Sequence, residues 1–285
     1  MNVTNRRFLI LGSAGQLAGE FRRILADRDM TYVAPTEERC DITDYDKLRR
    51  CIDETEPTVI LNCAAYNAVD AAEDNPEKAY AINRDAVASI ASIAAECGSF
   101  LVTYSSDYVF DGAKGELYTE NDEPNPLGAY GRSKREGELA VMSSSAKYLL
   151  LRPSWVFGHG SQNFLYKLGG WAKNNRVLKV SSDEISVPTY TADMVECTLV
   201  ALDRGLEGLY HLTNSGFCSR YELAEHYLNT IGADNELHPV PMSTFPVKAK
   251  RPGFSAMSNA KLAAALGASI PDWRNAVDRF VASKE

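Results

Sequence analysis

Buried apolar runs alternate with helical patterns along much of the chain, and this alternation restricts the fold more than any other feature. Short apolar runs typical of buried strands occupy residues 6–12, 31–34, 57–65, 99–106 and 148–158. Apolar side chains at helical spacing separate them, over residues 16–28, 45–55, 75–98 and 130–142. Strands that alternate with helices form right-handed crossovers, so the sequence predicts an α/β fold with a doubly wound parallel sheet.

A glycine-rich turn follows the first apolar run, at the junction where dinucleotide-binding folds place phosphate groups. Gly12 and Gly15 hold the first two positions of a GxxGxxG pattern, and Ala18 holds the third. Glycine lets the backbone turn tightly beside a pyrophosphate, while the third position needs only a small residue. Such turns also serve packing alone, but a position directly after the first strand favours a phosphate site. The expected cofactor contacts here are Gly12, Ala14, Gly15, Gln16 and Leu17.

The end of the second strand bears on the choice of nicotinamide cofactor. NAD-selective sites usually present an acid there to the ribose 2′-hydroxyl. Ala34, Pro35 and Thr36 supply none, although Glu37 and Arg39 follow closely. We therefore expect NADPH as the cofactor, with NADH also used.

A hydroxyl-rich strand end and a Tyr-Lys pair predict the catalytic centre. Ser106 and Asp107 come at the end of the run over residues 99–106, and Tyr130 and Lys134 lie one helical turn apart. A Tyr and a Lys at this spacing often occur by chance. The glycine turn, the stretch NCAAY and the hydroxyl-rich end all follow strands, however, and open α/β sheets bind ligands at that edge. We therefore predict that Ser106, Tyr130 and Lys134 meet in one site.

The chemistry expected of these three residues is the reduction of a carbonyl group. Hydride transfer from a nicotinamide to carbon leaves negative charge on the oxygen, which a proton donor and a hydrogen-bond donor stabilise. Tyr130 is the expected proton donor, and Ser106 positions and polarises the oxygen. We expect the ammonium of Lys134 to lower the pKa of Tyr130 from near 10 and to hold the nicotinamide ribose. Asp107 is either part of this site or a turn former at the strand end.

Composition and charge exclude several classes of partner. The chain has 285 residues, a net charge of −8 and a pI near 5.2, and it has no basic run. These features argue against nucleic acid and anionic membranes as partners.

No apolar run approaches the length of a membrane span, so we expect a cytoplasmic protein. The cysteines lack CxxC spacing and the histidines lack ligand spacing, so we expect reduced thiols and no metal.

Several stretches carry a resemblance to a known family. They run nearly end to end and include LGSAGQLAGE, PTVILNCAAYNAVDAAE, YSSDYVFDG, PLGAYGRSKREGE, LRPSWVFG and GLYHLTNSG. With them the chain resembles the extended short-chain dehydrogenase/reductase superfamily and, within it, the dTDP-4-dehydrorhamnose reductases. The resemblance implies NAD(P)H-dependent reduction of the 4-keto group of a dTDP-4-dehydro-6-deoxyhexose, in the first place dTDP-4-dehydro-L-rhamnose to dTDP-L-rhamnose.

The resemblance also implies roles for individual residues. Asp41 and Ile42 would contact adenine, and Ala64, Ala65 and Tyr66 would line the cofactor beyond the phosphate turn. Tyr130 and Lys134 would serve both the cofactor and catalysis. The sugar-facing residues would be Val69, Ser106, Asp107, Tyr108, Tyr130 and Trp155. Trp155 could instead pack as a core aromatic, but its place at the carboxyl edge of the sheet suits stacking on a sugar.

Two lobes are expected from the resemblance and from the looser pattern that begins after the last core strands. Residues 1–155, with about 187–215 returning to the same sheet, would form a dinucleotide-binding Rossmann domain. Residues 156–186 and 216–285 would form a smaller lobe that binds the nucleotide sugar. A dTDP diphosphate needs a local cation in a protein of net charge −8, and Lys250 and Arg251 are the expected pair. Arg251 could instead brace the C-terminal segment through a salt bridge.

Departures from the family pattern leave alternatives open. Asn67 and Ser106 stand where the family often has threonine, and DEISVPT replaces a common Asp-Gln-x-Gly-x-Pro-Thr stretch. These changes put the identity of the sugar in doubt, so a reductase for another dTDP-4-keto-6-deoxy sugar is an alternative. A regulatory subunit that resembles that of methionine adenosyltransferase is another, although the intact Ser106, Tyr130 and Lys134 set favours an enzyme. The oligomeric state is open, a homodimer included.

Overall fold

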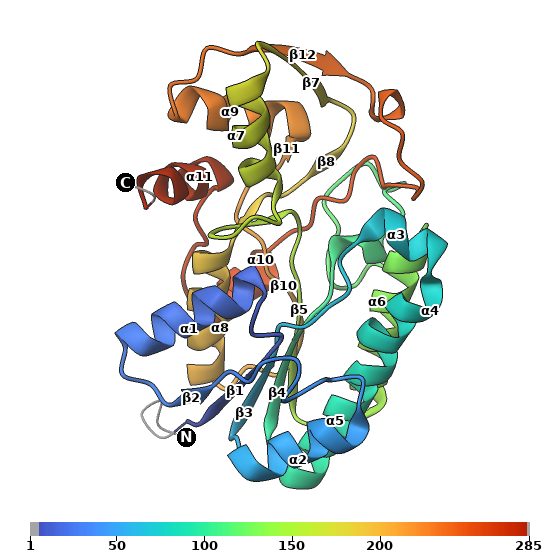
Figure 1. Ribbon diagram of the computed structural model, residues 1–285, viewed down its shortest axis with the longest axis vertical. Helices are drawn as coiled ribbons and strands as arrows, with labels where there is room; N and C mark the ends of the chain where they lie inside the picture. The colour runs from blue at the N-terminus through green and yellow to red at the C-terminus, as the bar shows by residue number, and fades with distance from the viewer. Residues whose placement is uncertain (1–5, 284–285) are drawn as a thin grey trace.

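A six-stranded parallel sheet forms the centre of the computed structural model, which describes residues 6–283 (Figure 1). In their order across the sheet, the strands are β10 (Gly208–His211), β5 (Tyr148–Arg152), β4 (Phe100–Tyr104), β3 (Val59–Asn62), β1 (Phe8–Leu11) and β2 (Tyr32–Val33). Every neighbouring pair in this sheet is parallel. This confirms the predicted α/β fold, in which the chain enters the sheet last as β10.

Helices cover both faces of the sheet, because alternate side chains of each strand point to opposite sides. Phe8 and Ile10 of β1 pack in one core, and Leu9 and Leu11 pack in the other. The first core lies under α1 (Gln16–Asp27), α8 (Thr191–Asp203) and α10 (Ala260–Leu266). The second lies under α2 (Tyr45–Thr55), α5 (Ala86–Cys97) and α6 (Ala129–Ser143). Figure 1 shows α1 and α8 on one side of the sheet and α2, α5 and α6 on the other.

The strand order reverses beside β1, and this reversal sets the place where a ligand can bind. The chain runs from β1 to β2 on one side and then crosses to β3 on the other. In open α/β sheets, the crevice at such a reversal lies outside the carboxyl ends of the strands and is the usual ligand site. The turn after β1 and the segment after β3 therefore meet at a binding crevice.

A second group of elements packs beyond the carboxyl edge of the sheet, around its own apolar core (Figure 1). Its helices are α7 (Phe164–Asn174), α9 (Arg220–Thr230) and α11 (Trp273–Ala282). Its short strands are β6 (Val156–Phe157), β7 (Val177–Ser181), β8 (Ile185–Ser186), β9 (Thr189–Tyr190), β11 (Cys218–Ser219) and β12 (Glu236–Val240). The division of the chain into two lobes remains a prediction. Helix α10, from the segment assigned to the smaller lobe, packs against the sheet through Leu262.

Two predicted elements differ from the observed ones. The helix predicted over residues 75–98 is divided into α4 (Pro76–Tyr80), a π-helical turn over Ala81–Asp85 and α5, and a short α3 (Val69–Asp74) precedes it. The strand predicted over residues 148–158 is interrupted after β5, and the chain continues as β6, which pairs with β9. In the interruption, Trp155 adopts the left-handed φ of 40°. The spacing of apolar residues does not reveal where one residue adopts unusual backbone angles. The sequence pattern therefore indicated continuous elements.

The remaining regular elements are two 3₁₀ turns, at Asp107–Val109 and Met242–Thr244. Within residues 6–283, no helix combines the length and the apolar character that a bilayer crossing requires.

Candidate active site

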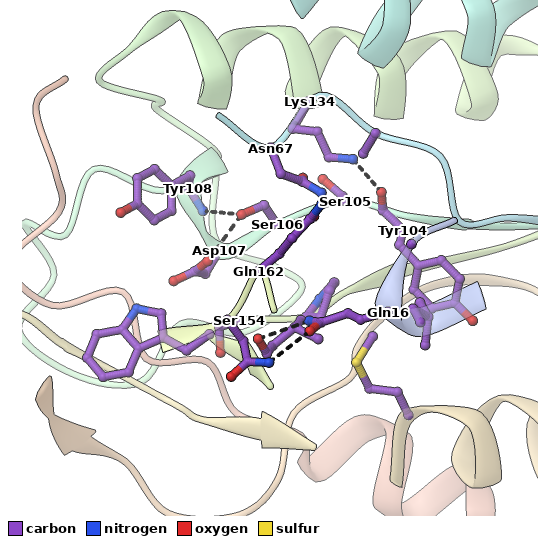
Figure 2. A pocket seen from close by; sticks show the side chains of 18 of the residues that line it. Gln16, Asn67, Tyr104, Ser105, Ser106, Asp107, Tyr108, Lys134, Ser154 and Gln162 are labelled. Carbon is purple, nitrogen blue, oxygen red and sulfur yellow. Dashed lines mark hydrogen bonds between the residues drawn. The ribbon is translucent and has the colours of Figure 1, made fainter. Parts of the chain in front are cut away.

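A cavity of about 340 Å³ opens at the carboxyl edge of the sheet, at the strand-order reversal (Figure 2). The predicted site residues that line it are Gly15, Gln16, Leu17, Ala64, Ala65, Val69, Ser106, Asp107, Tyr108, Tyr130, Lys134 and Trp155. The predicted site residues outside its lining are Gly12, Ala14, Asp41, Ile42, Tyr66 and Arg251. The structure thus brings Ser106, Tyr130 and Lys134 into one cavity.

The glycine turn packs closely against the segment after β3. Gly12 has φ of 75°, and a Cβ at this position would lie 2.6 Å from the backbone of Ala64, so no other residue fits without movement. Gly15 is the N-terminal cap of α1, and Ala18 is fully buried in the core beneath it. The first N–H groups of α1 have no partners within the helix, and the helix dipole makes this end positive. The turn can therefore hold an anionic group.

The segment after β2 contains the residues expected near adenine and the adenosine ribose. Ser13 Oγ donates to the Pro35 carbonyl (2.6 Å), which ties this segment to the glycine turn. Asp41 Oδ1 accepts from both the N–H (2.9 Å) and the hydroxyl (2.7 Å) of Thr43, and these bonds lower the pKa of Asp41. The Asp41 carboxylate is therefore directed at its own loop, and Ile42 beside it is buried.

The three residues of the predicted catalytic centre are all buried and come from two elements. Just after β4, Tyr108 N–H donates to Ser106 Oγ (3.1 Å), which in turn donates to Asp107 Oδ1 (3.1 Å). Lys134 Nζ of α6 donates to the carbonyl oxygen of Tyr104 (2.6 Å), as Figure 2 shows. Tyr130, one turn earlier on α6, donates from its hydroxyl to Asn67 Oδ1 (3.3 Å).

Close backbone contacts fix the catalytic helix α6 against its neighbours. A Cβ on Gly131 would lie 2.2 Å from the carbonyl oxygen of Tyr108, and a Cβ on Gly137 would lie 2.0 Å from that of Asn83. Asn83 belongs to the π-helical turn, and sequence reasoning missed it. The two glycines allow α6 to contact the Ser106 segment and this turn directly.

Burial dominates the electrostatics of Tyr130 and Lys134. Burial raises the pKa of Tyr130 to about 12, although the neighbouring Ser106 hydroxyl acts in the opposite direction. Burial also lowers the pKa of Lys134 to about 8, against the field of Glu138. The expectation that Lys134 lowers the pKa of Tyr130 is therefore wrong for this structure, because the removal of the phenol from water has the larger effect.

Asp107 is a fully buried carboxylate surrounded by hydroxyl groups. Besides Ser106, the hydroxyls of Ser186 (2.9 Å) and Ser255 (2.6 Å) donate to its Oδ2. Burial raises the pKa of Asp107, while the three serine bonds favour the charged form. Because Ser186 lies in β8, beyond the carboxyl edge of the sheet, Asp107 joins that group of elements to the segment after β4.

Several polar groups in the cavity wall lack partners. Within residues 6–283, Asn62 Oδ1, Ser105 Oγ and Trp155 Nε1 are buried and accept or donate no hydrogen bond. Buried polar groups are nearly always satisfied, so orphans that line a cavity point to a ligand. Sequence reasoning named Trp155 but missed Asn62 and Ser105, although each stands at or just after the end of a strand.

The predicted phosphate cation Arg251 is engaged elsewhere. Its guanidinium binds both carboxylate oxygens of Asp70 (2.7 and 3.1 Å), and this contact holds the pKa of Asp70 at about 2. Asp70 Oδ1 also accepts the backbone N–H groups of Lys248 and Ala249. The pair thereby ties the segment around residue 250 to α3.

Known proteins are similar to this chain in sequence and in architecture. Residues 6–285 match the family model described as RmlD substrate binding domain. The chain is 34% identical to a dTDP-4-dehydrorhamnose reductase of Burkholderia thailandensis, over 95% of this chain and 96% of the relative. A solved dTDP-4-dehydrorhamnose reductase of Clostridium acetobutylicum has a TM-score of 0.94 at 33% identity, covering 98% of this chain and 99% of that one. Another, of Bacillus anthracis in complex with NADP, has the same TM-score and coverage at 31% identity.

Proposed function

Because this chain belongs to the dTDP-4-dehydrorhamnose reductase family, we propose that it reduces the 4-keto group of dTDP-4-dehydro-L-rhamnose with NADPH, giving dTDP-L-rhamnose. The observation that carries the proposal is the meeting of Ser106, Tyr130 and Lys134 in one cavity beside the N-terminus of α1. A cavity of this composition supplies an acid, a hydrogen-bond donor and a cation to a carbonyl group.

The residues around the cavity fit a nicotinamide dinucleotide. The start of α1 after Gly15 presents N–H groups to a pyrophosphate. The orphan oxygens of Asn62 and Ser105 offer hydrogen-bond partners deeper in the cavity. When bound, NADPH supplies the hydride.

The chain itself supplies the proton and the polar surroundings of the carbonyl oxygen. A Tyr130 pKa of about 12 keeps the phenol protonated at neutral pH, so it can donate to the oxygen as negative charge develops. Ser106 supplies a second hydroxyl at the same place. The Lys134 ammonium, anchored on the Tyr104 carbonyl, favours negative charge on the reacting groups.

The sugar is proposed to lie between the two lobes, against Val69, Asp107, Tyr108 and Trp155, all of which line the cavity. Asp41, Ile42 and Tyr66 remain proposed contacts for the adenosine end of the cofactor. The smaller lobe, residues 156–186 and 216–285, is proposed to bind the nucleotide sugar. Action in the cytoplasm and assembly as a homodimer are also kept as proposals.

The test is incubation of the purified protein with dTDP-4-dehydro-L-rhamnose and NADPH, with loss of reduced cofactor followed at 340 nm. We expect one NADPH consumed per sugar and dTDP-L-rhamnose as the product by NMR. A product with the opposite configuration at C4 would instead indicate a reductase for another sugar. Tight NADPH binding without turnover of any dTDP-4-keto sugar would favour the regulatory alternative.

A further inference from the structure

Arg220 is the charged residue in the cavity wall that the proposed reaction leaves unused. The charged side chains that line the cavity, among the residues that the structure describes, are Asp107, Lys134 and Arg220. Lys134 Nζ is bound to the Tyr104 carbonyl, and Asp107 is surrounded by serine hydroxyls. Arg220 is therefore the cation that the smaller lobe contributes to the cavity.

The backbone around Arg220 is firmly placed. Arg220 is the first residue of α9, which begins with a capping box in which Ser219 and Glu222 bind each other's backbone N–H groups. The N–H of Arg220 donates to the carbonyl oxygen of Glu184 (3.2 Å). These bonds hold the backbone of Arg220 in place at the edge of the cavity.

The guanidinium of Arg220 is stacked rather than hydrogen-bonded. Its central carbon lies 3.5 Å from the centroid of the Trp155 ring and 5.0 Å from that of Phe164. In the described part of the chain its N–H groups make no hydrogen bond, and its ion pair with Glu184 spans 3.7 Å. A guanidinium stacked on an aromatic face keeps its in-plane donors available for a second partner.

Phosphate is the partner that this arrangement suits. The planar donors of arginine match two phosphate oxygens, and such charge-assisted bonds are the strong ones. A diphosphate that approaches a chain of net charge −8 needs a local cation, and Arg251 is already paired with Asp70 outside the cavity lining.

We propose that Arg220 binds the diphosphate of the nucleotide sugar while stacked on Trp155. The assignment rests on the proposed function for the identity of the sugar. Arg220 is a binding residue that lies away from the reacting carbonyl, so its loss raises KM for the sugar nucleotide and leaves kcat nearly unchanged.

The experiment measures the affinity of Arg220→Ala for dTDP and for thymidine by calorimetry. We expect dTDP to bind at least about tenfold more weakly, with thymidine and NADPH affinities unchanged, because only the diphosphate contact is lost. The matched control is Arg274→Ala. Arg274 also lies in the first turn of a helix and over a tryptophan, 4.3 Å from the Trp273 ring centroid, but outside the cavity lining.

A second control separates the two candidate phosphate cations. Arg251→Ala removes the contact with Asp70, so we expect a lower melting temperature and unchanged dTDP affinity. If Arg251→Ala weakens dTDP binding and Arg220→Ala does not, the assignment to Arg220 is overturned. Should Arg220→Ala fail to fold, Arg220→Lys and Arg220→Gln replace it. The lysine variant should retain part of the dTDP affinity and the glutamine variant should lose it.

The outcomes also distinguish this inference from the proposed reaction. Unchanged dTDP affinity in a folded Arg220→Ala protein overturns the assignment, as does an equal loss for dTDP and thymidine, which would mean that Arg220 only supports Trp155. Wild-type protein that binds dTDP through Arg220 but does not reduce the keto sugar refutes the reaction alone. Wild-type protein that does not bind dTDP refutes both.

Discussion

The side-chain amide of Asn83 binds both backbone polar groups of Tyr66. The Tyr66 N–H donates to Asn83 Oδ1 (2.9 Å), and Asn83 Nδ2 donates to the Tyr66 carbonyl oxygen (3.0 Å). The same Nδ2 donates to Ser133 Oγ (3.0 Å), whose hydroxyl donates to the Tyr130 carbonyl oxygen (2.7 Å). Asn83 thereby joins the segment after β3 to the helix that carries Tyr130 and Lys134.

Replacing Asn83 by alanine should loosen this junction. The Tyr66 backbone groups lose their partners, so we expect a loss of about 1–3 kcal/mol in the free energy of unfolding. We also expect a fall of about tenfold or more in kcat, because the geometry of α6 relative to the cavity is no longer fixed. Denaturant unfolding and steady-state kinetics measure the two effects. Ser133→Ala removes the bonds to Asn83 and to the Tyr130 carbonyl but leaves the Tyr66 backbone groups paired, so it should show a smaller loss of stability.

The contribution of Asn83 could not be predicted from the sequence, and the reason is physical. Its role depends on the π-helical turn over Ala81–Asp85, which directs the side chain toward Tyr66. The apolar pattern of residues 75–98 is that of an ordinary helix, and one extra residue in a turn barely disturbs it. The strands and the glycine turn, by contrast, follow from short local patterns, so the α/β fold with its parallel sheet was predicted correctly.

Tyr130→Phe tests the proton donor. The substitution keeps the ring, which packs edge-on against Tyr108 with centroids 5.6 Å apart, and removes only the hydroxyl. We expect NADPH affinity and melting temperature to be retained and kcat to fall by about 100-fold or more. Turnover equal to that of the wild-type protein would remove Tyr130 from the mechanism.

Lys134 should set the alkaline limit of activity. Its pKa of about 8 means that the ammonium loses its proton as pH rises through that value, so kcat/KM should fall above about pH 8. Stability should change in the opposite direction. The unfolded chain keeps this lysine protonated up to its ordinary pKa of 10.5, so it binds more protons than the folded chain between these values. Lys134 therefore contributes a rise in stability with pH over this interval.

Steady-state rates and thermal melts across pH 7 to about 10 separate the two effects. A fall in kcat/KM without a fall in melting temperature would support the assignment to Lys134. A flat kcat/KM over the whole range would contradict it.

The protein should use both NADPH and NADH as reductants. Because residues 34–36 carry no acid, we expect kcat/KM for NADPH and NADH to agree within about a hundredfold, or roughly 2.7 kcal/mol. Arg39 is exposed, and its contact with Glu54 is long, at 3.5 Å, so it is free to meet a 2′-phosphate. Arg39→Ala should lower kcat/KM for NADPH and leave that for NADH unchanged. A larger preference for NADH would instead indicate that Glu37 or Glu38 binds the ribose hydroxyls.

The ion pair of Arg251 shows the other limit of what the sequence can predict. In the sequence, Lys250 and Arg251 stand together in a Pro-bounded loop, but ion pairing depends on residues far away in the chain. Asp70 precedes Arg251 by 181 residues and still binds it through two hydrogen bonds. In the sequence, Arg220 is simply the residue after Ser219 at the start of a helix. Its contact with the Trp155 ring is visible only in the folded chain.

The contact of Gly131 with the carbonyl oxygen of Tyr108 leaves no room for a side chain. Helix α6 and the turn that begins after Ser106 are therefore in direct backbone contact, and this contact fixes the spacing between Tyr130 and Ser106. In a chain built in this way the backbone holds the reacting groups, so substitutions in the side chains proposed to face the sugar can change the sugar preference while the reaction chemistry is kept.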